Sequence, residues 1–146
     1  MASYTGTTNV YNAWLDYLTK GANISSDSFS MGLSSSAYTP NQATHALLAD
    51  ITNELSGNGY SRQVLASVTS NRSGAVQTFD FADPVFTASG GSIVARYWWI
   101  INTTVAGSPL VAYGLIDSTP ADVTTTSGNT LTINVNASGL FTVTRS

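Results

Sequence analysis

From residue 27 onward, apolar side chains recur at every second position, and runs of turn-forming residues interrupt them. Phe29, Met31 and Leu33 alternate with small polar residues, which is typical of a strand with one buried face. Similar patterns predict strands over residues 63–69, 76–81, 84–88, 92–102, 110–117, 129–134 and 139–144. Gly, Pro, Asn and Ser are frequent in the intervening segments and favour turns, for example over residues 57–59 and 71–74. Short strands at this spacing indicate a β-sandwich or barrel. We expect an antiparallel β-sandwich, jelly-roll or immunoglobulin-like.

The N-terminal part of the chain follows a different period. Apolar residues recur at helical spacing between Val10 and Leu18, and Gly21 stands where a helix cap is expected. Before them, residues 2–9 are small and polar apart from one tyrosine. Residues 43–55 are compatible with one or two further helical turns. A chain of 146 residues is the size of one domain. We therefore expect an extended arm over residues 1–9 and a single β-sandwich domain over 10–146 that includes a helix over 10–20.

Charged residues are scarce. They make up 9% of the chain, against roughly 25% in ordinary soluble domains, and Ser, Thr and Asn take their place on the polar surface. Binding that neutralises phosphates needs clustered Lys and Arg, but the five cations are scattered and the net charge is −3. We therefore expect no nucleic-acid partner.

Cysteine and membrane signals are both missing from the sequence. The absence of cysteine excludes disulfides, a thiol nucleophile and thiolate metal sites. The most hydrophobic run, residues 93–101, is far shorter than the ~20 apolar residues that cross a membrane, and it contains Arg96. No secretory signal is visible at the N-terminus. The expectation is a protein made in a cytoplasm, with no membrane partner.

Few residues suggest catalysis. His45 is the only histidine, and we interpret it as a structural residue at the start of a short helix. Asp80 and Asp83 are three apart and could bind a cation or act as an acid–base pair, but no neighbouring run completes an oxygen cage, so a strand end and turn is the simpler interpretation. Asp50 and Glu54 fit a solvated helix face. The sequence thus predicts no enzyme, no catalytic, metal or cofactor site, and no small-molecule substrate.

The run from Arg96 to Ile101 contains two adjacent tryptophans. Consecutive side chains of a strand point to opposite faces, so Trp98 and Trp99 cannot share one core. If Trp99 faces inward, Trp98 lies on the other face. Either a second layer, such as the N-terminal helix, covers that face, or the face packs on a partner chain or a ligand such as a sugar ring. The second interpretation gives these interface candidates: Tyr4, Tyr11, Trp14, Arg96, Trp98 and Ile100.

Several short motifs occur in an order that resembles a family of small tailed-phage virion proteins. They are Tyr38-Thr39-Pro40-Asn41, His45 with Asp50-Ile51, the turn Glu54-Leu55-Ser56-Gly57-Asn58-Gly59-Tyr60, and Ala95-Arg96-Tyr97. The resemblance covers about residues 29–141. The chain departs from the family at Trp98-Trp99, where smaller apolar residues are expected.

The resemblance implies a non-enzymatic role in a phage particle, as a head decoration or cement protein. The implied partners are the major capsid protein and other copies of the chain, with a trimer favoured over a dimer. The implied location is the outer capsid surface, after synthesis in the bacterial host cytoplasm.

A second interpretation stays open. A β-sandwich with aromatic residues and a Ser-, Thr- and Asn-rich surface is also typical of a carbohydrate- or host-receptor-binding module of a phage tail or head fibre.

Overall fold

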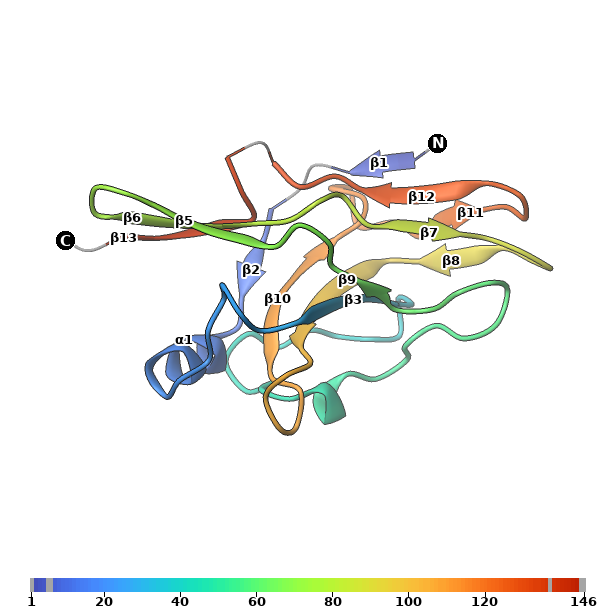
Figure 1. The fold of residues 1–146 in the computed structure, drawn as a ribbon. Helices are drawn as coiled ribbons and strands as arrows, with labels where there is room; N and C mark the ends of the chain where they lie inside the picture. The colour runs from blue at the N-terminus through green and yellow to red at the C-terminus, as the bar shows by residue number, and fades with distance from the viewer. Residues whose placement is uncertain (1, 5–6, 137, 145–146) are drawn as a thin grey trace.

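The fold is mainly β and has three tiers (Figure 1). The computed structural model describes residues 2–4, 7–136 and 138–144. Side chains are described for residues 7–136 and 138–144. An upper layer of short sheets covers a five-stranded middle sheet. Below the middle sheet lie the loops of residues 35–60. The helix α1 (Asn12–Thr19) lies beside one end of the sheet, and its Trp14 packs into the core above it. The architecture is the expected β-sandwich with one short N-terminal helix.

The middle sheet is buried on both faces. Its strand order is β2-β10-β9-β3-β4, and neighbouring strands are antiparallel. The bounds are β2 (Asn9–Val10), β3 (Phe29–Ser34), β4 (Gln63–Val64), β9 (Tyr97–Asn102) and β10 (Leu110–Leu115). Every residue of β3 is buried, including the small polar residues that alternate with its apolar ones. The alternation therefore predicts this strand correctly, but the expected exposed face is covered by the lower tier.

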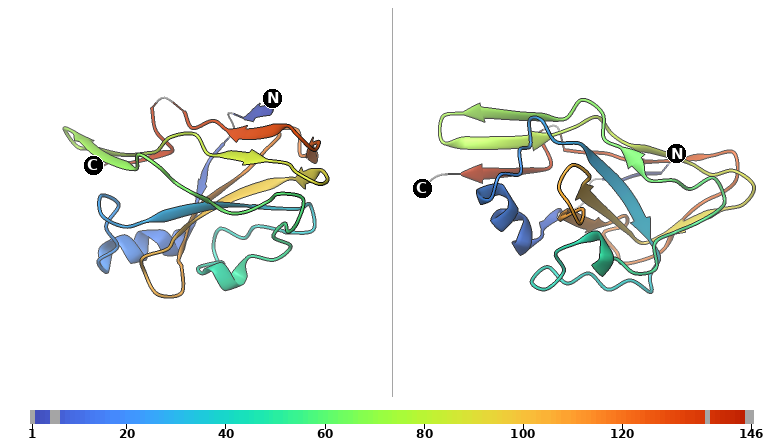
Figure 2. Two further views of the ribbon diagram at one scale, coloured as in Figure 1. Left: turned by 45° about the vertical axis from the view of Figure 1, so that its right-hand side comes forward. Right: turned by 60° about the horizontal axis from the view of Figure 1, so that its bottom comes forward.

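The upper layer contains three small sheets (Figure 2). In the first, β12 (Thr130–Ile133) lies between β1 (Ala2–Tyr4) and β7 (Val85–Thr87). In the second, β6 (Val76–Asp80) lies between β13 (Phe141–Thr144) and β5 (Thr69–Ser73). The third pairs β11 (Val123–Thr125) with β8 (Ile93–Ala95). All these pairs are antiparallel except β1 with β12.

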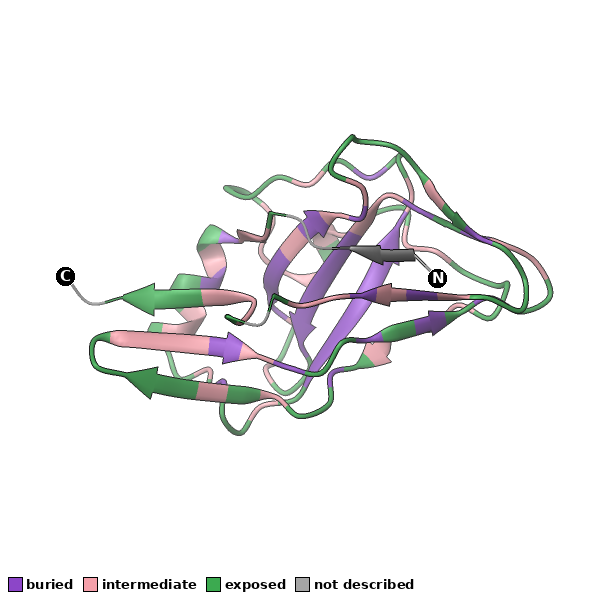
Figure 3. Ribbon diagram, turned by 90° about the horizontal axis from the view of Figure 1, so that it is seen from above, coloured by how far each residue is buried: buried purple, intermediate pink, exposed green. Residues whose placement is uncertain are grey.

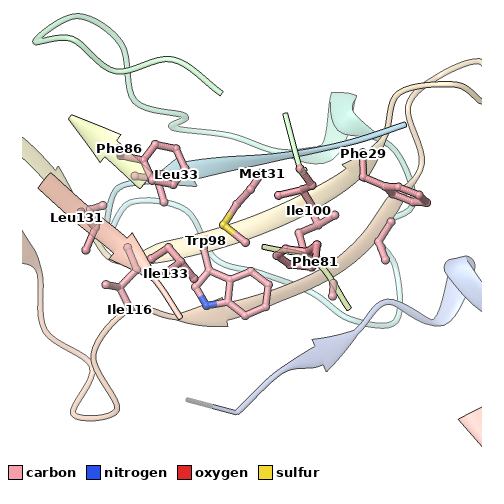
Figure 4. Close-up of a cluster of buried hydrophobic side chains, with 14 of the residues drawn as sticks. Phe29, Met31, Leu33, Phe81, Phe86, Trp98, Ile100, Ile116, Leu131 and Ile133 are labelled. Atoms are coloured by element: carbon pink, nitrogen blue, oxygen red, sulfur yellow. The ribbon is translucent and has the colours of Figure 1, made fainter. Parts of the chain in front are cut away.

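Two hydrophobic cores lie on the two faces of the middle sheet. The upper core fills the space between the layers (Figure 4). The middle sheet contributes Met31, Trp98 and Ile100, and the upper layer contributes Phe86 and Ile133. The lower core lies between the middle sheet and the loops beneath it. Its fully buried members are Tyr11, Tyr38, Trp99, Ile101 and Leu110. The two tryptophans thus point into different cores, as strand alternation requires.

Two glycines make room for the two tryptophans. Gly32 is the register partner of Trp99, and a Cβ at Gly32 would lie 2.2 Å from its ring. Gly114 is the register partner of Trp98, and a Cβ there would lie 2.6 Å from that ring. Each indole therefore lies flat over a neighbouring strand, because that strand has no side chain at the point of contact.

The sheet of β5, β6 and β13 extends past the middle sheet at one end of the molecule (Figure 3). Most of β5 and β13 is exposed, whereas Phe79 of β6 is buried and anchors the sheet to the upper core. This projecting sheet therefore has two open edges.

Several predicted boundaries are wrong. The helix is shorter than 10–20. The strand expected over 63–69 is only Gln63–Val64, and the turn expected at 71–74 contains the end of β5. The helical turns expected in 43–55 are one 3₁₀ turn, η1 (Leu48–Asp50). No helix in the described ranges is long and apolar enough to cross a membrane.

The expected N-terminal arm pairs with the chain itself. Its β1 adds to the upper layer, where Tyr4 is the register partner of Ile133, and β2 adds to the middle sheet beside β10. The segment therefore contacts both layers.

Candidate functional site

Four of the predicted interface residues are core residues, so the prediction is wrong for them. Trp98 is 2% exposed, and Tyr11, Trp14 and Ile100 are fully buried. The face that carries Trp98 is covered by the upper layer and by Trp14 of α1, which packs edge-on against Phe29. The interpretation in which a second layer covers this face is correct. Large apolar side chains gain most from burial, and here the chain supplies that burial itself.

The other two candidates have different surroundings. Arg96 lies at the bend between β8 and β9, where its Nε donates to Asp122 Oδ1 at 2.8 Å. This ion pair joins the bend to the segment before β11, which gives Arg96 a structural use. The side chain of Tyr4 lies outside the described side chains.

The acidic residues of the sequence also have partners within the chain. Asp80 Oδ1 accepts from Phe81 N at 2.9 Å, and Asp83 Oδ1 accepts from Val135 N at 2.7 Å. Glu54 binds Arg62 through two hydrogen bonds and accepts a third from the hydroxyl of Tyr60. Among the described residues, no group of three His, Asp or Glu side chains is placed to hold a metal ion.

The Glu54–Arg62 pair supports the lower core. The Arg62 guanidinium carbon lies 5.4 Å from the centroid of the Trp99 ring, within cation–π range. The Trp99 Nε1 donates to Ser34 Oγ at 3.0 Å. Trp99 is therefore held by a polar contact at its nitrogen and by a cation over its face.

A chain of hydrogen bonds joins the lower core to His45. The hydroxyls of Tyr11 and Tyr38 are 2.9 Å apart, and the Tyr38 hydroxyl lies 3.0 Å from His45 Nδ1. The imidazole also stacks on the Tyr38 ring. Burial raises the pKa of Tyr11 and of Tyr38 above the usual range, so both hydroxyls stay protonated. These contacts attach His45 to the lower core.

Tyr38→Phe is expected to cost more stability than Tyr11→Phe. Loss of the Tyr38 hydroxyl leaves the fully buried Tyr11 hydroxyl without its partner, which costs about 1–3 kcal/mol. Loss of the Tyr11 hydroxyl leaves Tyr38 still bound to His45, so the cost is about 0.5–1.5 kcal/mol. Urea unfolding of both variants and of the double variant measures this. Equal costs, or the reverse order, would contradict the assignment.

Asp50 makes the stability of the 3₁₀ turn depend on pH. Its Oδ2 accepts from the backbone N–H groups of Ala46 and Leu47 at 2.8 and 2.9 Å, and these bonds hold the pKa of the carboxyl below its usual range. The stabilisation is present above the unfolded-state pKa of about 3.9 and is lost as the pH falls through the lower folded-state pKa. The difference in unfolding free energy between the natural chain and Asp50→Asn is therefore expected to shrink from pH 6 to pH 3. Ser56→Ala, at an exposed uncharged site, serves as the control; a constant Asp50→Asn difference would refute the prediction.

A cleft of about 350 Å³ opens on the lower side of the middle sheet. Tyr97 of β9 and Tyr113 of β10 form its aromatic part, and both are half-buried. We call it the tyrosine cleft. Its other lining residues are Thr7, Asn9, Thr39, Pro40, Leu115, Ser118 and Pro120. Every lining residue is uncharged, and sequence reasoning missed the site. The available signal was strand alternation, which puts Tyr97 on the face opposite Trp98; the register of β9 with β10 adds Tyr113 to that face.

The outward side of the upper layer is covered mainly by hydroxyl groups. The register of its strands places the following residues there, and we call them the hydroxyl face: Thr69, Asn71, Ser73, Val76, Thr78, Val85, Thr87, Thr130, Thr132, Thr142 and Thr144. Phe79, Phe86 and Leu131 point the opposite way, into the core. Of the charged residues in these strands, Asp80 shares this side, and Arg72 points away from it.

Comparison with known proteins gave no match: no family model fits the chain, and neither the curated proteins nor the solved structures contained a similar protein.

Proposed function

We propose that this chain is a non-enzymatic structural protein of a tailed-phage particle, a decoration or cement protein on the outer surface of the head. The observation that carries the proposal is the hydroxyl face, which spans two sheets and is almost free of charge. The motifs that resemble small virion proteins add support. The partners would be the major capsid protein and neighbouring copies of the chain, in a closed cyclic oligomer with a trimer favoured.

A neutral face suits a protein that is packed at high density on a shell. Repulsion between identical neighbours is weak when few charges face one another, and the contact with the shell depends little on salt. Threonine and asparagine side chains supply the hydrogen bonds that such a contact needs. Each copy would bridge adjacent capsid subunits and add its interface energy to the resistance of the shell.

The first test counts copies of the chain in purified particles by quantitative mass spectrometry. Hundreds of copies per particle support a shell component. A dozen or fewer would place the chain at the tail or at a single vertex and would overturn the proposal.

Attachment is expected to persist in about 1 M NaCl, where the Debye length is about 3 Å. The measurement is the number of copies that remain on particles after a salt wash. Release of the natural chain by salt would indicate ion-pair attachment instead.

A second experiment adds recombinant variants to particles that lack the chain. The double variant Thr78→Glu with Thr87→Glu places two charges on the hydroxyl face and should abolish binding. Thr52→Glu, in the loops of the lower tier, should bind normally.

A further inference from the structure

The tyrosine cleft contains two aromatic rings that are already fixed in position. Tyr113 packs against Tyr11 with ring centroids 4.9 Å apart, and Tyr97 meets Tyr38 edge-on at 5.8 Å. Tyr11 and Tyr38 are buried and joined by their hydroxyls. The rings that line the cleft are therefore backed by a rigid part of the lower core, and a ligand would not have to order them.

The hydroxyls of these two tyrosines differ from those of Tyr11, Tyr38 and Tyr60. Tyr11, Tyr38 and Tyr60 each have a hydrogen-bond partner inside the chain. Within the described residues, neither Tyr97 nor Tyr113 has one, although both rings are half-buried. Nothing in the described ranges engages these hydroxyl groups, so we infer that they can bind a ligand in the cleft.

The rest of the lining limits the chemistry of that ligand. Pro40, Leu115 and Pro120 add apolar surface, while Thr39, Asn9 and Ser118 add neutral donors and acceptors. A charged ligand would lose its hydration here without gaining an opposite charge. The volume falls in the range of roughly 300–1,000 Å³ that is usual for small-ligand sites.

We propose that the tyrosine cleft binds a neutral saccharide. A sugar ring has an apolar C–H face, which fits against a tyrosine ring, and a rim of hydroxyls, which fits the uncharged donors and acceptors of the cleft. The cleft lies on the lower face of the middle sheet, whereas the hydroxyl face is the outward side of the upper layer, which covers the other face of that sheet. A copy attached through the hydroxyl face would therefore present the cleft away from the shell.

The test is titration of the ¹⁵N-labelled chain with neutral tetrasaccharides built from glucose, mannose, galactose or N-acetylglucosamine, followed by NMR. At least one is expected to shift amide signals around Tyr97 and Tyr113 in a saturable way at millimolar concentration. Tyr97→Ala should weaken that binding at least about tenfold. Tyr97→Phe with Tyr113→Phe, which keeps the rings, tests the hydroxyls and should weaken it less. Tyr17→Phe, at a half-buried tyrosine on α1, should have no effect.

Two results would overturn the proposal. One is the absence of saturable shifts with every neutral tetrasaccharide, in a chain whose spectrum shows it to be folded. The other is stronger binding of a sialylated glycan or of a proline-rich peptide than of any neutral sugar. Neither result depends on how many copies a particle contains, so the cleft and the attachment to the shell are tested separately.

Discussion

Gly32→Ala is expected to lower the free energy of unfolding by at least about 3 kcal/mol, at or above the usual upper end for overpacking in a core. The added Cβ would lie 2.2 Å from Cη2 and 2.3 Å from Cζ2 of Trp99, far inside van der Waals contact. Trp99 is fully buried, and its Nε1 is bound to Ser34. Because the ring is fixed, either the strands must separate or the indole must leave its site.

Chemical denaturation of the variant gives this value, and two further variants identify its cause. Gly74→Ala, where a Cβ meets no atom within 4 Å but φ is +61°, should cost only about 1–2 kcal/mol from backbone strain. Trp99→Leu in the Gly32→Ala background should restore part of the stability, so that the two changes together cost less than their sum. Additive costs would show that the clash with Trp99 is not the reason.

Trp98→Ala is expected to destabilise the isolated chain by about 3–5 kcal/mol, the usual cost of removing a buried aromatic side chain. The indole is part of the upper core, where it lies beside Met31 of the middle sheet and Ile133 of the upper layer (Figure 4). The cavity left behind would be lined by strands of both layers, which cannot close on it without breaking their own pairing. Thermal and urea unfolding at low protein concentration measure the loss without any contribution from self-association.

Two phenylalanine variants separate packing from hydrogen bonding at the tryptophan pair. Trp98 Nε1 is buried without a hydrogen-bond partner among the described residues, so Trp98→Phe removes packing alone. Trp99→Phe also removes the bond to Ser34 and should cost about 1 kcal/mol more. An unchanged unfolding free energy for Trp98→Ala, together with loss of self-association, would instead restore Trp98 as an interface residue.

Local patterns predict elements of this fold better than they predict what covers them. The alternation of Phe29, Met31 and Leu33 identifies β3, and the alternation of Trp98 and Trp99 correctly assigns them to opposite faces. What covers each face is decided elsewhere in the chain. The upper layer over Trp98 includes β7 and β12, and the loops of residues 35–60 cover the face of Trp99. The sequence alone therefore does not decide whether the Trp98 face is buried under a second layer or binds a partner.

The wrong boundaries also have physical reasons. The turn expected at 71–74 is dominated by small polar residues, but β5 lies at the edge of the projecting sheet, where exposed Asn71 and Ser73 cost little. The strand expected over 63–69 is interrupted because Ser67 has a positive φ of 53°. By contrast, the Gly57-Asn58-Gly59 turn is predicted correctly, and all three of its residues have positive φ.

The candidate site was missed because it exists only after the strands pair. Tyr97 and Tyr113 are 16 residues apart in the sequence, and the register of β9 with β10 brings them to one face. Tyr38 belongs to one of the motifs that resemble virion proteins. It supports the two tyrosine rings of the cleft, because its ring contacts Tyr97 and its hydroxyl binds Tyr11, which packs on Tyr113. Motifs in the sequence can thus mark part of a cleft, here Thr39, Pro40 and Tyr97, but only strand pairing shows that Tyr113 completes it.

The double burial of the middle sheet sets up a gradient of local stability across the molecule. Backbone amides of β3, β9 and β10 are covered on both faces and should exchange with solvent deuterium only when the whole chain unfolds. The projecting strands β5 and β13 have one exposed side and open edges, so their amides can exchange through small local openings. Part of the proposed attachment surface is therefore built on the most compliant strands, which can adjust to a curved lattice while the rigid interior keeps its shape.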